Sequence, residues 1–184
     1  RSRLDFVSLH AQSKPDAVAQ IEEDRRLTWR ELLERRNTVA GALAKLGVGR
    51  GEHVIVYAPN SLECLLASAA TRAANAVPVP MNHRLVAEEV SYILENSDAV
   101  AAFVGGPSWR WPTRSGERAA KIRLWILLGE ERRSWATSLD DLLEQARRAA
   151  GGRPGPGSRR LHDLHRRHHR QTERARFARP PIRR

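Results

Sequence analysis

The sequence has little of what marks a secreted or membrane-spanning protein. Cys64 is the single cysteine among 184 residues, which excludes an internal disulfide and fits a reducing compartment. No apolar run approaches the roughly 20 residues of a membrane-spanning helix, and the first residues do not form a signal peptide. These absences predict a cytoplasmic protein without a membrane span. The sequence begins at Arg1 instead of Met, so we expect a fragment or a processed start.

Lysine is scarce too, with three residues against 29 arginines, and the arginines are unevenly spread. Residues 151–184 hold 11 arginines and only two acids, a net charge of +9. Since the whole chain carries +11, residues 1–150 carry +2, an ordinary value for a globular domain. The sequence therefore predicts a domain at residues 1–150 and a separate basic tail at residues 151–184.

The first half of the domain begins with a hairpin and a capped helix. Residues 17–29 read as two short strands around a turn. Thr28 and Glu31 have the spacing of a capping box, which predicts a helix over residues 29–46, and Gly47 suits the left-handed position that ends it. One face of this helix is predicted from residues that recur at helical spacing: Trp29, Leu32, Leu33, Arg36, Ala40, Leu43 and Leu46.

The rest of the domain alternates buried strands with helices. The pattern predicts strands at residues 53–58 and 99–104, an extended VPVP segment, a further strand in LWILLG, and helices at residues 60–74, 86–96 and in SLDDLLEQA. We expect Asn60 with Glu63 to cap the second helix and Asn75 to end it. Ser138 is expected to start the last helix. Strands alternating with helices of this length indicate βαβ units and a parallel sheet, with residues 53–58 and 99–104 as neighbours.

Two stretches carry a family resemblance. They are LTWRELLERRNTVAGALAKLGVGRGEHVIVYAPNS and ATRAANAVPVPMNHRLVAEEVSYILENSDAVAAFV. Over about 100 residues their order resembles the opening of the adenylate-forming (AMP-dependent) synthetases and ligases, and the turn Asn82-His83-Arg84-Leu85 is most like that of fatty-acyl-CoA synthetases. One departure is Asn75, where the family usually has glycine. The fold that this implies is α/β, an incomplete N-terminal portion of the family's large domain followed by a disordered basic tail.

The resemblance implies ATP-dependent, AMP-forming activation of a fatty acid and its transfer to CoA. ATP, Mg²⁺ and CoA would be cofactors of the intact family, and we expect none of them to bind specifically to this chain. The family's phosphate loop, of the form Y-T-S-G-T-T-G-x-P-K-G, should follow the SLDDLLEQA helix. This chain has LHDLHRRHHRQTERAR at residues 161–176 instead.

A reading-frame slip accounts for that substitution. One permitted set of codons for residues 161–176, read one base later, encodes SMIYTAGTTGKPKGR, the missing loop. We place the slip between about Ala146 and Gly157, and a second, compensated slip would explain PSWRWPTRS at residues 107–115. The hypothesis is that the chain is a truncated, inactive piece of a ligase.

The tail also admits other interpretations. Its four histidines, at positions 162, 165, 168 and 169, could bind Zn²⁺, for which imidazole is a common ligand. The surrounding arginines, however, would repel a doubly charged cation. Arginine-rich segments bind nucleic acid phosphates without sequence specificity. The alternative function is thus a small basic binding protein with an Arg/His-rich nucleic-acid- or metal-binding tail. A disordered, solvated tail with no specific nucleic-acid partner and no metal site is the interpretation we favour.

Within the domain we assign no catalytic residue. Arg84 is the candidate cofactor-binding residue, because the resemblance implies a cation in this turn near the CoA phosphates; a surface salt bridge is the other role open to it. Cys64 reads as a packed thiol, and Asp140 with Asp141 as stabilisers of a helix N-terminus. Because the sheet would lack its later strands, we expect an uncovered edge and self-association through it.

Overall fold

The computed structural model describes residues 5–106, 119 and 121–149. The elements in chain order are α1 (Phe6–Ser13), β1 (Val18–Glu22), β2 (Arg25–Thr28), α2 (Trp29–Lys45), β3 (His53–Tyr57), α3 (Leu62–Ala73), β4 (Val77–Met81), α4 (Ala87–Asn96), β5 (Ala99–Gly105), β6 (Leu124–Leu128), β7 (Thr137–Ser138) and α5 (Leu139–Ala149). The predicted disordered tail and the segment proposed for a second frame slip lie outside the described residues.

A five-stranded parallel sheet organises the described domain. Its strand order is β4-β3-β5-β6-β7, and every neighbouring pair is parallel. The predicted α/β class is confirmed, as is the parallel pairing of the strands predicted at residues 53–58 and 99–104, which are β3 and β5. The VPVP segment forms β4 and LWILLG contributes β6.

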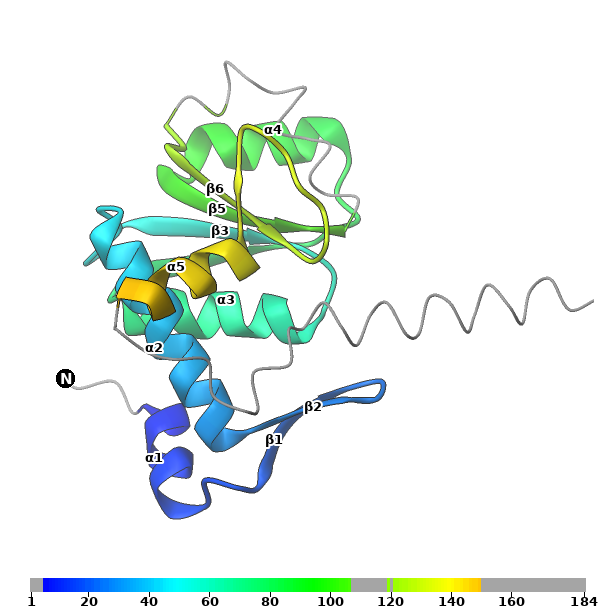
Figure 1. The fold of residues 1–184 in the computed structure, drawn as a ribbon. Coiled ribbons are helices and arrows are strands. Elements are labelled where there is room, and N and C mark those ends of the chain that lie inside the picture. The colour runs from blue at the N-terminus through cyan, green and yellow to red at the C-terminus, as the bar shows by residue number, and fades with distance from the viewer. Residues whose placement is uncertain (1–4, 107–118, 120, 150–184) are drawn as a thin grey trace, which may run out of the picture. The chain divides into compact units, whose positions relative to one another are not determined.

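Helices cover both faces of this sheet (Figure 1). Successive side chains of a strand point to opposite faces, so Val54 and Val56 join the core beneath α2, α3 and α5. Ile55 and Tyr57 join a second core, in which Val90 and Leu94 of α4 pack. Burial on both sides is the reason that β3 and β5 read as continuous apolar runs instead of alternating ones.

The helix ends follow the sequence closely, with one correction. The capping box is present: the Thr28 hydroxyl accepts from the Glu31 amide at 3.3 Å, and the Glu31 carboxylate accepts from the Thr28 amide at 2.9 Å. The expected cap of α3, Asn60 with Glu63, is wrong. Ser61 occupies that position, and its hydroxyl accepts from the Cys64 amide at 3.1 Å.

Left-handed residues end two of the helices as expected. Gly47 follows α2 with a φ of 79°, and Asn75 follows α3 with a φ of 61°. Asparagine tolerates this conformation better than most non-glycine residues. Asn75 therefore supplies the left-handed turn at which the family resemblance leads us to expect glycine.

The helix α1 was not predicted, and it explains an oddity in the sequence. Arg36 lies on the apolar face of α2 and is only 6% exposed. Its guanidinium donates to the carboxylate of Asp5, the N-cap of α1, at 2.6 Å, and to the Ser8 hydroxyl at 3.1 Å. This buried cation attaches α1 to α2.

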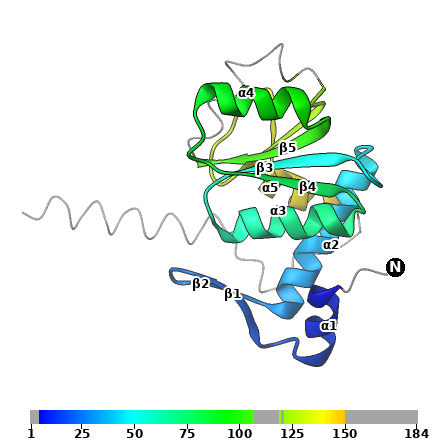
Figure 2. The same ribbon diagram turned by 180° about the vertical axis from the view of Figure 1, so that it is seen from behind.

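The antiparallel hairpin β1–β2 precedes α2 (Figure 2), and an ion-pair network attaches it to α3. Arg25 contacts the carboxylates of both Glu63, at 2.5 Å, and Glu22. Glu22 also accepts a hydrogen bond from the Leu62 amide at 3.0 Å, at the start of α3. Three charged side chains thus fix the hairpin to the N-terminal turn of one helix.

Candidate functional site

The candidate site lies at the carboxyl edge of the sheet, where parallel strands end together. From β3 the chain goes out to β4 and then returns past β3 to β5, so its direction across the sheet reverses between β3 and β5. In open parallel sheets ligands bind outside the carboxyl ends of strands at such a reversal. Three segments meet this edge: residues 58–61 before α3, residues 82–86 after β4, and Gly106 after β5.

The turn after β4 presents Arg84. The Asn82 side-chain oxygen accepts from the Arg84 amide at 3.0 Å, and the Asn82 carbonyl accepts from the Leu85 amide at 3.1 Å. Glu89 then accepts from the Val86 amide at 3.1 Å as α4 begins. These bonds fix the backbone on both sides of Arg84.

The Arg84 side chain itself is exposed and has no ion-pair partner in the part of the chain that the structure describes. The surface salt bridge considered from the sequence is therefore not formed among those residues. A guanidinium on an ordered turn without a carboxylate partner is suited to a phosphate or carboxylate from outside, because it offers planar paired donors.

Beside this turn, β3 and β5 end in very close contact. A Cβ added at Gly106 would lie 3.0 Å from the Pro59 ring, and Gly106 has a φ of 57°. One added at Gly105 would lie 3.0 Å from the Ala58 Cβ. This contact was not predicted from the sequence, although a Gly-Gly pair at the end of a buried strand is a sign of close backbone approach.

Cys64 lies near this edge, in the first turn of α3, and is half-buried. Burial raises the pKa of its thiol, and the charge of Glu63 raises it further. Both effects oppose thiolate formation, so the position suits a packed thiol better than a nucleophile.

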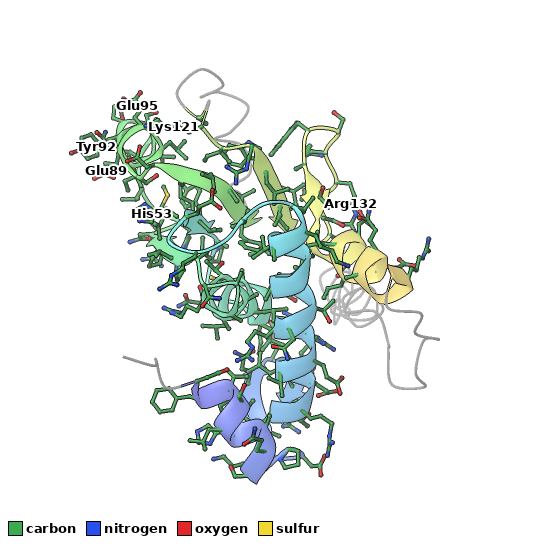
Figure 3. The ribbon with its side chains drawn as sticks, turned by 90° about the vertical axis from the view of Figure 1, so that its left-hand side faces the viewer. His53, Glu89, Tyr92, Glu95, Lys121 and Arg132 are labelled. Carbon is green, nitrogen blue, oxygen red and sulfur yellow. The ribbon has the colours of Figure 1, made fainter. Side chains whose placement is uncertain are left out.

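Asp140 and Asp141 occupy the first turn of α5, where the Ser138 hydroxyl accepts from the Asp141 amide at 3.0 Å. Arg132, labelled in Figure 3, lies within 3.4 Å of Asp140 and 3.7 Å of Asp141. Their contacts are those of helix-stabilising residues, as predicted.

The outer side of α4 is polar and exposed. Figure 3 shows Glu89, Tyr92 and Glu95 directed away from the sheet, and Tyr92 is 67% exposed. Within the described ranges, no three His, Cys, Asp or Glu side chains are grouped so as to hold a metal ion. The tail histidines lie outside those ranges, so the metal-binding interpretation of the tail is untested.

Comparison with known proteins establishes the family. Residues 7–163 match the family model of the AMP-binding enzymes, and the chain belongs to that family. The predicted resemblance is confirmed.

Several of the curated relatives are CoA ligases. The chain is 39% identical over 97 residues to a medium/long-chain-fatty-acid–CoA/3-oxocholest-4-en-26-oate–CoA ligase of Mycobacterium marinum, covering 53% of this chain and 18% of that protein. It is 38% identical over 94 residues to the long-chain-fatty-acid–CoA ligase FadD13 of Mycobacterium tuberculosis, covering 50% and 18%. The chain therefore aligns with about a fifth of the length of these relatives.

Solved structures agree on the fold. An anthranilate CoA ligase, AuaEII, in complex with anthranoyl-AMP superimposes with a TM-score of 0.73 at 23% identity, over 77% of this chain and 27% of that one. The apo structure of MbtA from Mycobacterium smegmatis gives 0.71 at 29% identity, over 85% and 28%. Among the described residues, no helix is both long enough and apolar enough to span a membrane.

Proposed function

We propose that this chain is the N-terminal part of a fatty-acid–CoA ligase, which activates a fatty acid with ATP to an acyl-adenylate and transfers the acyl group to CoA. The observation that carries this proposal is the identity of 37–39% over 97 residues to ligases named for medium- and long-chain fatty acids or for a steroid carboxylate. The domain at residues 1–150 would supply the scaffold, and residues 151–184 a separate basic tail.

Arg84 would contact a CoA phosphate in the intact enzyme. Its guanidinium is exposed and unpaired among the described residues, and the Asn82 turn holds its backbone. A phosphate is the ligand that such a cation recognises best. The described residues thus fit the anionic part of CoA at one position.

We propose that the described residues do not form the site for Mg²⁺ and the ATP phosphates. They contain no cluster of three or more His, Cys, Asp and Glu side chains that could hold a metal ion, and the lysine-bearing loop expected from the family is replaced in the sequence at residues 161–176. We propose that the chain as written does not catalyse adenylation and binds no cofactor specifically. Loss of a whole set of charge-stabilising groups lowers a rate by many orders of magnitude.

The frame-slip hypothesis supplies the experiment. Pyrophosphate exchange into ATP would be measured with medium- and long-chain fatty acids, on this chain and on a version restored by one base change and extended downstream. We expect exchange only in the restored enzyme. Exchange by the 184-residue chain would refute its inactivity, and a folded but inactive restored enzyme would refute the ligase assignment.

The Arg84 contact has its own test in the restored enzyme. Arg84→Ala should raise the KM for CoA about tenfold, as expected for one exposed charged hydrogen bond, with pyrophosphate exchange unchanged. Arg50→Ala is the matched control, because Arg50 is also exposed but precedes β3 at the opposite edge of the sheet. Equal KM values in the two variants would exclude Arg84 from the CoA site.

For the intact enzyme we propose fatty acid, ATP and CoA as substrates, no specific nucleic acid and a cytoplasmic location. The absence of a specific nucleic-acid partner can be tested by passing the natural chain over an immobilised DNA duplex at physiological salt. If the duplex retains the chain and a non-specific competitor DNA does not release it, that statement is wrong.

A further inference from the structure

The strand β4 ends the sheet among the described residues, and its sequence alternates valine with proline. The strand reads Val77, Pro78, Val79, Pro80, Met81, and β3 is its only neighbour among the described strands. An edge of this kind is where the sequence predicted self-association. The positions of its backbone donors decide whether that edge can take another strand.

Backbone groups of successive residues in a strand point alternately to the two neighbouring positions in the sheet. The Val77 amide donates to the Glu52 carbonyl at 2.8 Å, on the β3 side. By alternation, Val79 and Met81 also face β3, whereas residues 78 and 80 face away from it. Both outward positions are proline, which has no N–H to donate.

We propose that Pro78 and Pro80 make the outer side of β4 an edge that only accepts hydrogen bonds, and that this edge rejects strand addition by a second copy of the chain. Two such edges brought together would oppose carbonyl oxygens to carbonyl oxygens without one backbone N–H between them at these positions. Buried unpaired carbonyls are costly, so the contact is unfavourable.

The other edge of the described sheet is β7, which contains only Thr137 and Ser138. Such a short strand offers little backbone for pairing. The two edges are therefore closed by different means, β4 by its missing donors and β7 by its length. This proposal is opposed to the self-association through a sheet edge that we expected from the sequence, and the experiment below decides between them.

The test restores the donors without adding apolar surface. The variant Pro78→Thr/Pro80→Thr returns an N–H to both outward positions and uses a polar residue of high strand propensity. Pro15→Thr is the control, since Pro15 lies in the turn between α1 and β1, outside the sheet. Sedimentation velocity over a concentration series would give the self-association constant of each full 184-residue chain.

We expect the double variant to self-associate about tenfold more tightly than the natural chain, or tighter still, because several backbone hydrogen bonds become available. Pro15→Thr should match the natural chain. Association through any other surface is common to all the chains and cancels from the comparison. Equal constants for the natural chain and the double variant would overturn the proposal.

A single variant guards against misfolding. Pro80 is exposed, so Pro80→Thr disturbs packing little and should shift association in the same direction by a smaller factor. Circular dichroism would confirm that each variant is folded. If Pro80→Thr is folded and associates no more tightly than Pro15→Thr, the proposal is wrong even where the double variant cannot be studied.

Discussion

The ion-pair network between the hairpin and α3 predicts an asymmetry between two substitutions of the same pair. The Arg25 and Glu63 side chains are 11% and 12% exposed, and Arg25 is also paired with Glu22. Arg25→Met leaves two carboxylates close together without their cation. Glu63→Gln keeps an amide oxygen in place and leaves Arg25 paired with Glu22.

The expected magnitudes follow from this difference. Removing one partner of a buried ion pair costs about 3–5 kcal/mol, and the slight exposure here places Arg25→Met near 3 kcal/mol, at the lower end of that range. Glu63→Gln loses charge but not its hydrogen-bond acceptor and should cost about 1 kcal/mol. The double variant Arg25→Met/Glu63→Leu removes both charges, so it should be more stable than Arg25→Met alone.

The same network gives a pH dependence. Burial alone would raise the pKa of Glu63, but the hydrogen bond and charge of Arg25 outweigh it and hold the pKa below the usual 4.5. A lowered pKa in the folded state means that the stabilisation is fully present above about pH 4.5 and is lost as the pH falls through the folded value. In Glu63→Gln this part of the acid sensitivity should disappear.

Urea unfolding followed by tryptophan fluorescence would measure these free energies, since Trp29 lies directly after β2. From most to least stable, we expect the natural chain, then Glu63→Gln, then Arg25→Met. Equal destabilisation of the two single variants would contradict this prediction, and so would a double variant that is less stable than Arg25→Met.

Three further outcomes are expected in the same assay. Leu43→Ala should lower the free energy of unfolding by about 2–5 kcal/mol, because Leu43 is fully buried in the core and its truncation leaves a cavity. A loss below about 1 kcal/mol would mean that neighbouring side chains move in to fill the cavity. Gly106→Ala should destabilise by at least about 1 kcal/mol, because its positive φ and the Pro59 ring at 3.0 Å both oppose a Cβ, and an unchanged midpoint would contradict that contact. Burial raises the pKa of Asp5, but hydrogen bonds from Ser8 and then Arg36 lower it to about 2. Asp5→Ala should therefore cost at least about 1 kcal/mol near neutral pH, because α1 loses its cap and the buried Arg36 loses its carboxylate partner. The difference from the natural chain should shrink as the pH falls from 4 towards 2.

Local patterns were sufficient to predict most of the elements. The Thr28–Glu31 box, the left-handed Gly47 and the apolar runs of β3 and β5 each depend on interactions within a few residues, or on burial that an apolar run already indicates. The family resemblance could be predicted for the same reason, because it consists of such segments in a fixed order. The short helix α1 was missed, since it buries no residue that a periodic pattern could show.

The candidate site was predicted less completely. Arg84 came from the resemblance, and only the structure shows that its turn is ordered by Asn82 and that no described carboxylate pairs with it. The Gly106–Pro59 contact joins residues 47 positions apart in the sequence. A local pattern cannot identify a contact partner so far away along the chain.

The sequence by itself determined which segments are helices and strands, because caps, glycines and apolar spacing act over a few residues. Tertiary structure alone decided the partners of its charges. Arg36 stood on an apolar face without an evident reason until Asp5, 31 residues earlier, was placed beside it. Glu63 was read as a cap, yet it pairs with Arg25, 38 residues away, and leaves the cap to Ser61. A buried charge needs an opposite charge in space, and the chain distance to that partner is set by the fold.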